Sequence, residues 1–206
     1  MRAWRSPPDG YVRAGAIDLD NDPRLKRTLL LAGVGWTIVC VLVICGAAGA
    51  ARSLTFQVDG RSAAGWVGFG AFVLGVALAG VFAVVLHEAV HGIFIWLFTG
   101  DRPVFGFKGW YAYAGAPGWY FRRTPFLVVL LAPFVLVTAA GMVLYLVLPS
   151  TAAVVALVVA LCNAIGSIGD LYICVRLSAL RGSVVLEDRA DGMAWWLPAL
   201  EGQAAT

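Results

Sequence analysis

The chain consists mainly of long apolar runs, separated by short stretches that hold most of the charged residues. One uncharged run covers residues 28–51, a second run over 62–100 contains a single acid, and a third uncharged run covers 124–169. Pro149-Ser150 breaks the third run into two pieces of about 20 residues, the length that crosses the hydrocarbon core of a bilayer. The pattern predicts an all-α integral membrane protein with four transmembrane helices.

The four helices are expected at about residues 28–51, 64–99, 125–148 and 151–175. The second is longer than one crossing requires, so it is tilted, kinked at a glycine or extended beyond the hydrocarbon. Composition agrees with this class, because 61% of the residues are hydrophobic, 13% are charged and the mean hydropathy is +0.84. These values exclude an ordinary soluble domain.

The segments outside the helices divide the chain into three parts. Residues 1–27 contain prolines, acids and six basic residues before any apolar run, so they predict a cytosolic N-terminal arm without regular structure at its start. A cleavable signal peptide would have a different pattern, and the first helix is therefore expected to act as a signal anchor. Residues 28–176 form the membrane domain. Residues 177–206 form a cytosolic tail in which a short strand or an interfacial anchor is expected.

The loop between the second and third helices is rich in aromatic residues. Two aromatic stretches, 104–113 and 119–123, flank a Gly/Pro turn at 114–118, which predicts a short β-hairpin or a re-entrant loop. One interpretation is an aromatic belt at the lipid headgroups, and the other is an exposed strand edge that pairs with an unwound substrate. Both interpretations are compatible with the composition.

The distribution of basic residues predicts the orientation. With four spans, thirteen of the fifteen lysines and arginines fall on the side that holds both termini and the central loop, and only Arg52 and Arg61 fall on the other. The positive-inside rule then places both termini in the cytosol of a protein that crosses the inner (plasma) membrane several times. The net charge of +3 is explained by basic loops that face anionic lipid, so no nucleic-acid partner is expected.

The only two histidines lie four residues apart, in His87-Glu88-Ala89-Val90-His91. On a helix, residues at i and i+4 project from one face, so both imidazoles can reach one ion. Glu88 is placed to act on a water at the metal rather than to bind the metal. This spacing is typical of zinc-dependent hydrolases; the alternative is a pair of structural histidines in a chance match. Because ionisable groups inside apolar helices are costly and usually functional, the metal site is the preferred interpretation.

A zinc site of this kind needs a third protein ligand, with the fourth position left to water. Asp170 is the candidate, because the second and fourth helices both run inward and place it in the same half of the membrane as the histidines. It is also the only acid between Asp101 and Glu187. The alternative is a carboxylate at a helix end that pairs with Arg176 or an interfacial lysine.

Asn163 precedes Asp170 by two helical turns and lies on the same face of the predicted helix. Its amide could bind the substrate carbonyl or stabilise an oxyanion. It could equally bond to a neighbouring helix, as asparagines in membrane helices do. Neutral imidazole ligands also require hydrogen-bond acceptors for their second ring nitrogen.

These motifs resemble those of small bacterial membrane proteins classed as putative zincin peptidases, a family similar to the site-2 intramembrane metalloproteases. The resemblance covers roughly residues 60–195 and rests on His87–His91 followed by Gly92, Phe105-Gly106-Phe107, Leu131-Ala132-Pro133-Phe134 at the opening of the third helix, Asn163 with Gly169-Asp170, and a tail motif near Glu187-Asp188-Arg189. It implies zinc ligands at His87, His91 and Asp170, with Glu88 as the catalytic acid/base. Site-2 proteases usually show an Asn followed by a Pro and then an Asp-Gly pair. Here Gly166 stands where the proline is expected, and Leu171 follows Asp170.

The resulting hypothesis is a zinc-dependent endopeptidase that hydrolyses peptide bonds of membrane protein or peptide substrates, within or beside the bilayer. Glu88 would take a proton from the attacking water and deliver it to the leaving amine. A zinc hydrolase acting on lipid or another amide is a near alternative. A catalytically silent metal-binding scaffold is a further one, although such a protein would not need Glu88. The substrate, the pathway and the oligomeric state are open at this point.

Overall fold

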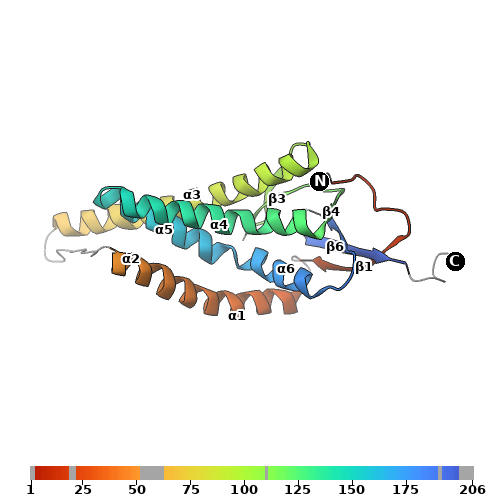
Figure 1. Ribbon diagram of the computed structural model, residues 1–206. Helices are drawn as coiled ribbons and strands as arrows, with labels where there is room; N and C mark the ends of the chain where they lie inside the picture. The colour runs from red at the N-terminus through yellow and green to blue at the C-terminus, as the bar shows by residue number, and fades with distance from the viewer. Residues whose placement is uncertain (1–2, 19–21, 52–62, 110, 190–191, 200–206) are drawn as a thin grey trace. The chain divides into compact units, whose positions relative to one another are not determined.

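The computed structural model describes residues 3–18, 22–51, 63–109, 111–189 and 192–199. Most of these residues are helical (Figure 1). The helices are α1 (Pro23–Cys40), a π-helical turn η1 (Val41–Cys45), α2 (Gly46–Ala51), α3 (Ala63–Thr99), α4 (Arg123–Val147), α5 (Ser150–Gly166) and α6 (Ile168–Ala179).

Three helical segments are long and apolar enough to cross a membrane. They are Pro23–Ala51, Val67–Thr99 and Arg123–Val147, and the bent pair α5–α6 makes a fourth if it counts as one span. Only 11% of the most apolar window of each of the first two segments is buried inside the protein. Large side chains such as Leu30, Val67 and Leu97 are exposed on them. Apolar surface of this extent is stable in lipid and not in water, so the chain is a membrane protein.

The fourth predicted helix, expected as one element over 151–175, is broken. The axes of α5 and α6 differ by 43°. At the break, the Ser167 hydroxyl donates to the carbonyl oxygen of Asn163 at 2.8 Å, and the Ser167 N–H donates to the same oxygen at 3.1 Å. Serine bonding to the i−4 carbonyl bends helices, and Gly166 and Gly169 on either side are poor helix formers.

A four-stranded antiparallel sheet is the main departure from the predicted all-α class. Its strand order is β1 (Tyr11–Asp18), β6 (Gly192–Pro198), β5 (Val185–Asp188) and β4 (Trp119–Arg122). Strand β1, red in Figure 1, pairs with β6, blue, so segments from near the two ends of the chain lie side by side. The N-terminal segment was expected to begin without regular structure, and its strand, β1, starts at Tyr11. β2 (Val104–Phe107) and β3 (Ala112–Gly115) pair with each other between α3 and α4.

By its internal contacts the chain divides into two units. The first comprises Met1–Leu31, Glu88–Pro133 and Gly169–Thr206, and the second comprises Ala32–His87 and Phe134–Ile168. The core of the first unit contains side chains from the sheet together with α3, α4 and α6, among them Ile95, Phe121 and Leu186. Long helices such as α3 contribute residues to both units.

The second unit is helical, and two of its aromatic side chains bond to the backbone of neighbouring helices. The indole N–H of Trp36 on α1 donates to the carbonyl oxygen of Ala164 on α5 at 2.7 Å. The hydroxyl of Tyr145 on α4 donates to that of Ala48 on α2 at 2.9 Å. The hydrocarbon of a bilayer offers polar groups no hydrogen-bond partners, so these bonds stabilise the packing of the helices against each other.

Some predictions fall on residues that lie outside the described part of the chain. One is the loop with Arg52 and Arg61, the two basic residues that were assigned to the side of the membrane opposite the termini. The other is Trp110 in the aromatic loop.

Candidate metal centre

Helix α3 positions both histidines on one face. His87 and His91 are separated by one helical turn, and their exposed fractions are 8% and 6%. Both rings are thus buried side by side along the helix, as the i, i+4 spacing predicts.

Both nitrogens of the His91 ring face an oxygen atom. Its Nδ1 lies 2.9 Å from the carbonyl oxygen of Val129 on α4, and its Nε2 lies 3.5 Å from Oδ2 of Asp170 on α6. A carbonyl oxygen only accepts hydrogen bonds, so Nδ1 carries the proton and donates. In the neutral ring, Nε2 then presents its lone pair on the side of the Asp170 carboxylate.

Pro133 explains why the Val129 carbonyl is available. In an α-helix this carbonyl would accept a hydrogen bond from the N–H of residue 133, four positions further on. Residue 133 is a proline inside α4, and proline has no N–H. The helix thus leaves one carbonyl for the imidazole. The resemblance had placed Pro133 at the opening of this helix, whereas α4 begins ten residues earlier, at Arg123.

His87 is oriented by Asn163, which is 2% exposed. Its Nδ1 lies 2.9 Å from the Asn163 side-chain oxygen, while the Asn163 amide nitrogen donates to the Thr138 hydroxyl at 2.9 Å. Because the Asn163 oxygen is an acceptor, Nδ1 of His87 is again the donor and Nε2 keeps the lone pair. Both histidines are therefore held in the same tautomer.

Asp170 lies in the first turn of α6, directly after the break at Ser167. Its ligand atom and one nitrogen each from His87 and His91 all lie within 4.8 Å of one another. The negative charge at a helix N-terminus is stabilised by the helix dipole. The break therefore starts a new helix whose N-terminal carboxylate approaches His91.

These side chains fit a zinc ion. Two neutral imidazoles and one carboxylate are the ligand set of zinc hydrolases that leave one position open. Each histidine already bonds through Nδ1 to an oxygen that accepts its proton, and bonds of this kind fix the ligating nitrogen in zinc sites. In addition, a cation bound between the Nε2 lone pair of His91 and the Asp170 carboxylate oxygen would attract both of these electron-rich atoms.

Glu88 is half-buried on the same turns of α3. It follows His87 directly and precedes His91 by three residues, so it lies on the turn that carries both candidate ligands. A carboxylate beside the ligands, and not among them, is placed to exchange protons.

One comparison with known proteins decides the family. The sequence pattern of the family described as "Putative zincin peptidase" matches residues 80–183, half of the chain. The chain belongs to the putative zincin peptidase family. Its membership indicates a zinc metallopeptidase, in agreement with the geometry of the three candidate ligands. No curated protein and no solved structure matches the chain.

The segment shared with the putative zincin peptidase family includes all five candidate residues: His87, Glu88, His91, Asn163 and Asp170. It also includes the three residues that the sequence analysis missed as parts of the site, namely Val129, Pro133 and Thr138. Pro133 could have pointed to Val129, because a proline inside a helix leaves the carbonyl four residues before it without its helical N–H donor. The match ends before β5 and β6, so the tail motif near Asp188 lies beyond it.

Next to His91, the β2 strand packs closely against α3. A methyl group added at Gly92 would come within 2.5 Å of Phe105 Cζ and 3.2 Å of Pro103 Cγ. The Phe105 ring of β2 therefore lies against the residue that follows the second histidine, and a side chain at Gly92 would have to displace this ring.

Proposed function

We propose that this protein is a zinc-dependent endopeptidase that hydrolyses peptide bonds of membrane protein substrates within or beside the bilayer. His87, His91 and Asp170 would hold the zinc, and Glu88 would act as acid and base. The observation that supports this most directly is the shared tautomer of the two histidines, because each Nδ1 faces an oxygen that accepts its proton. Such a pair is prepared to bind a cation through Nε2.

Zinc bound there would polarise the scissile carbonyl and allow a water molecule to lose a proton near neutral pH. The Glu88 carboxylate accepts that proton as the water oxygen bonds to the carbonyl carbon. Glu88 then transfers the proton to the amide nitrogen as the C–N bond breaks, so that a carboxylic acid and an amine leave. The Val129 carbonyl and the Asn163 amide hold the imidazoles still during both steps.

The membrane setting supports a relation to the site-2 intramembrane proteases. The histidines lie within the candidate span Val67–Thr99, and Thr99 marks its end. The basic residues favour an inner (plasma) membrane orientation with both termini in the cytosol, which would place this end of the span near the cytosolic surface. Water could then reach the site from that side.

Asn163 was predicted to bind substrate, and it remains a candidate for that role. Its amide oxygen and nitrogen are already engaged by His87 and Thr138. We therefore propose that the main role of Asn163 is to position His87.

The experiment is a metal count and an activity assay on the full chain in detergent, with Glu88→Gln, Asp170→Ala and Glu187→Gln. The last is a matched control, since Glu187 is also half-buried but bonds to Trp196 in the sheet. The wild type, Glu88→Gln and Glu187→Gln should each bind about one zinc per chain, and Asp170→Ala clearly less. Cleavage of a transmembrane model peptide should fall about 10²–10⁴-fold in Glu88→Gln and stay unchanged in Glu187→Gln.

Two results would refute the proposal in different ways. A wild-type chain without any transition metal would remove the metal centre itself. Full zinc loading without any Glu88-dependent cleavage of peptides would refute the peptidase activity. The protein would then be a catalytically silent zinc-binding protein or a hydrolase of another substrate class. An assay of lipid and amide hydrolysis on the same preparation would separate those two.

A further inference from the structure

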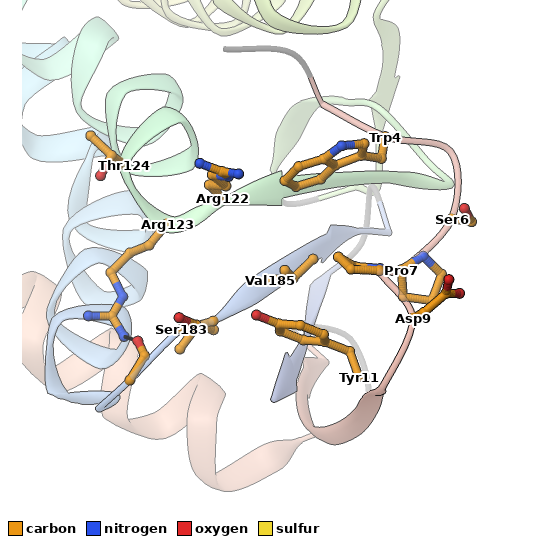
Figure 2. A pocket seen from close by; sticks show the side chains of 13 residues that line it. Trp4, Ser6, Pro7, Asp9, Tyr11, Arg122, Arg123, Thr124, Ser183 and Val185 are labelled. Atoms are coloured by element: carbon orange, nitrogen blue, oxygen red, sulfur yellow. Dashed lines mark hydrogen bonds between the residues drawn. The ribbon is translucent and has the colours of Figure 1, made fainter. Parts of the chain in front are cut away.

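A cavity lies in the first unit, and its walls contain no residue of the candidate metal centre. Its volume is about 810 Å³, and its walls come from the N-terminal segment, the start of α4 and the segment that leads into β5. Figure 2 shows Trp4 and Arg122 on one side of it and Tyr11 and Ser183 on the other.

The cavity carries two adjacent arginines. The Arg122 side chain is exposed, with its guanidinium carbon 5.4 Å from the centre of the Trp4 ring. Arg123 donates to the carbonyl oxygens of Leu180 at 2.6 Å and Gly182 at 3.2 Å. Within the described parts of the chain, neither arginine forms an ion pair with a carboxylate. Asp9 is the one acid along the walls, so the lining keeps an excess of positive charge.

Further donors lie in the same walls. Helix α4 begins at Arg123, its first turn contains no acid, and the Thr124 hydroxyl also lines the cavity. The first turn of a helix has N–H groups without helical partners and carries a partial positive charge. Ser183 and Tyr11 add hydroxyl groups (Figure 2). Guanidinium, hydroxyl and helix N–H groups together are the donors that bind phosphate.

The position of the cavity along the chain indicates where it lies in a membrane. The candidate span Arg123–Val147 begins with a residue of the cavity wall. The end of a span lies at the level of the lipid headgroups, where phosphates are abundant. Trp4 and Tyr11 beside the arginines are the aromatic residues that favour this level.

We propose that this cavity binds a phosphate group, with Arg122 as its main charged contact. The donors can accept either the phosphate of an anionic lipid headgroup or a free phosphate. The site is independent of the proposed peptidase activity, because neither the candidate metal ligands nor Glu88 are among the residues that line it.

The test is a calorimetric titration of the full chain in an uncharged detergent. The probes are short-chain phosphatidylglycerol, inorganic phosphate and, as a lipid without phosphate, a short-chain diacylglycerol. The wild type should bind phosphatidylglycerol, and Arg122→Gln should bind it at least about tenfold more weakly because a charge-assisted contact is lost. Arg181→Gln is the matched control: it removes the same charge from an exposed residue outside the cavity, and it should bind as the wild type does.

A second variant keeps the proposal testable if Arg122→Gln affects folding. Ser183→Glu places a carboxylate at an exposed position of the cavity wall, and it should abolish binding by charge repulsion. Equal affinity for inorganic phosphate would identify a soluble phosphate as the ligand, whereas binding of phosphatidylglycerol alone would identify the lipid headgroup. Binding of diacylglycerol as tightly as phosphatidylglycerol would overturn the proposal. Absence of binding, or an equal loss in Arg122→Gln and Arg181→Gln, would overturn it as well.

Discussion

Replacement of Asn163 by leucine tests whether this residue prepares His87 for zinc. Leucine has the same branched shape as asparagine but no polar atoms, so the change removes the acceptor that lies 2.9 Å from Nδ1 of His87. The imidazole then loses the group that keeps the proton on Nδ1, and Nε2 is no longer fixed as the nitrogen with the lone pair. The Thr138 hydroxyl loses its amide partner in the same variant.

The expected loss of zinc affinity can be estimated from the bond between Asn163 and His87. Removal of an outer-shell partner of a metal-binding histidine lowers metal affinity about 10–100-fold, which corresponds to about 1.4–2.8 kcal/mol of binding free energy. The buried Nδ1–H left without an acceptor lowers the free energy of unfolding by about 1–3 kcal/mol as well. Zinc affinity should therefore fall together with stability, while bound zinc at saturation stays at about one per chain.

The assay is competition for zinc against a chromophoric chelator, with thermal unfolding measured on the same samples. Asn163→Asp is the control, because its carboxylate accepts from Nδ1 of His87 and the Thr138 hydroxyl can turn to donate to it. It should keep zinc affinity close to that of the wild type. A substrate-binding residue would behave differently: Asn163→Leu would then raise KM with unchanged zinc affinity, and that result would refute the positioning role.

Three other changes give separate tests. Pro133→Ala restores an N–H that competes with His91 for the Val129 carbonyl, so zinc affinity should fall about tenfold in chelator competition. The melting temperature should hardly change, since alanine is about 3 kcal/mol better than proline inside a helix, which offsets the lost ring carbons; unchanged zinc affinity would contradict this account. Asp188→Ala leaves the buried Ala116 N–H without the carboxylate that lies 2.9 Å away, so denaturant unfolding should show a loss of about 1–3 kcal/mol with metal content unaffected. Removal of zinc by a chelator should lower the melting temperature reversibly, because free zinc at a hundred times its Kd stabilises the folded chain by about 2.7 kcal/mol; equal melting curves with and without the chelator would show that the folded chain binds no zinc.

Much of the helical part of this protein could be predicted from local pattern. The length and composition of the apolar runs predict membrane helices because each backbone group inside lipid must find a partner within its own segment. The i, i+4 spacing of His87 and His91 predicts a shared face because the helical repeat is a local property. Asp170 was chosen from topology and from the scarcity of acids, and the structure brings it to 3.5 Å from His91.

The broken fourth span and the small sheet could not be predicted in this way. A uniform apolar run conceals the bend at Ser167, which depends on one side-chain bond to the Asn163 carbonyl. The sheet pairs Tyr11 with Pro198, and no local period connects residues so far apart in the sequence. Both segments carry mixed polar and apolar residues, and their strand character depends on the partner that each finds in the folded chain.

The sequence by itself determined that the chain enters a membrane, and it placed two histidines and a glutamate on one stretch of helix. Both follow from local properties of the sequence, namely the composition of the apolar runs and the helical repeat. Only the tertiary structure decided which atoms prepare those histidines. The Val129 carbonyl is available because Pro133 lacks an N–H, and the Asn163 amide reaches His87 from a helix more than seventy residues further along the chain. Hydrogen-bond partners of this kind depend on how helices pack, so they exist only in the folded molecule.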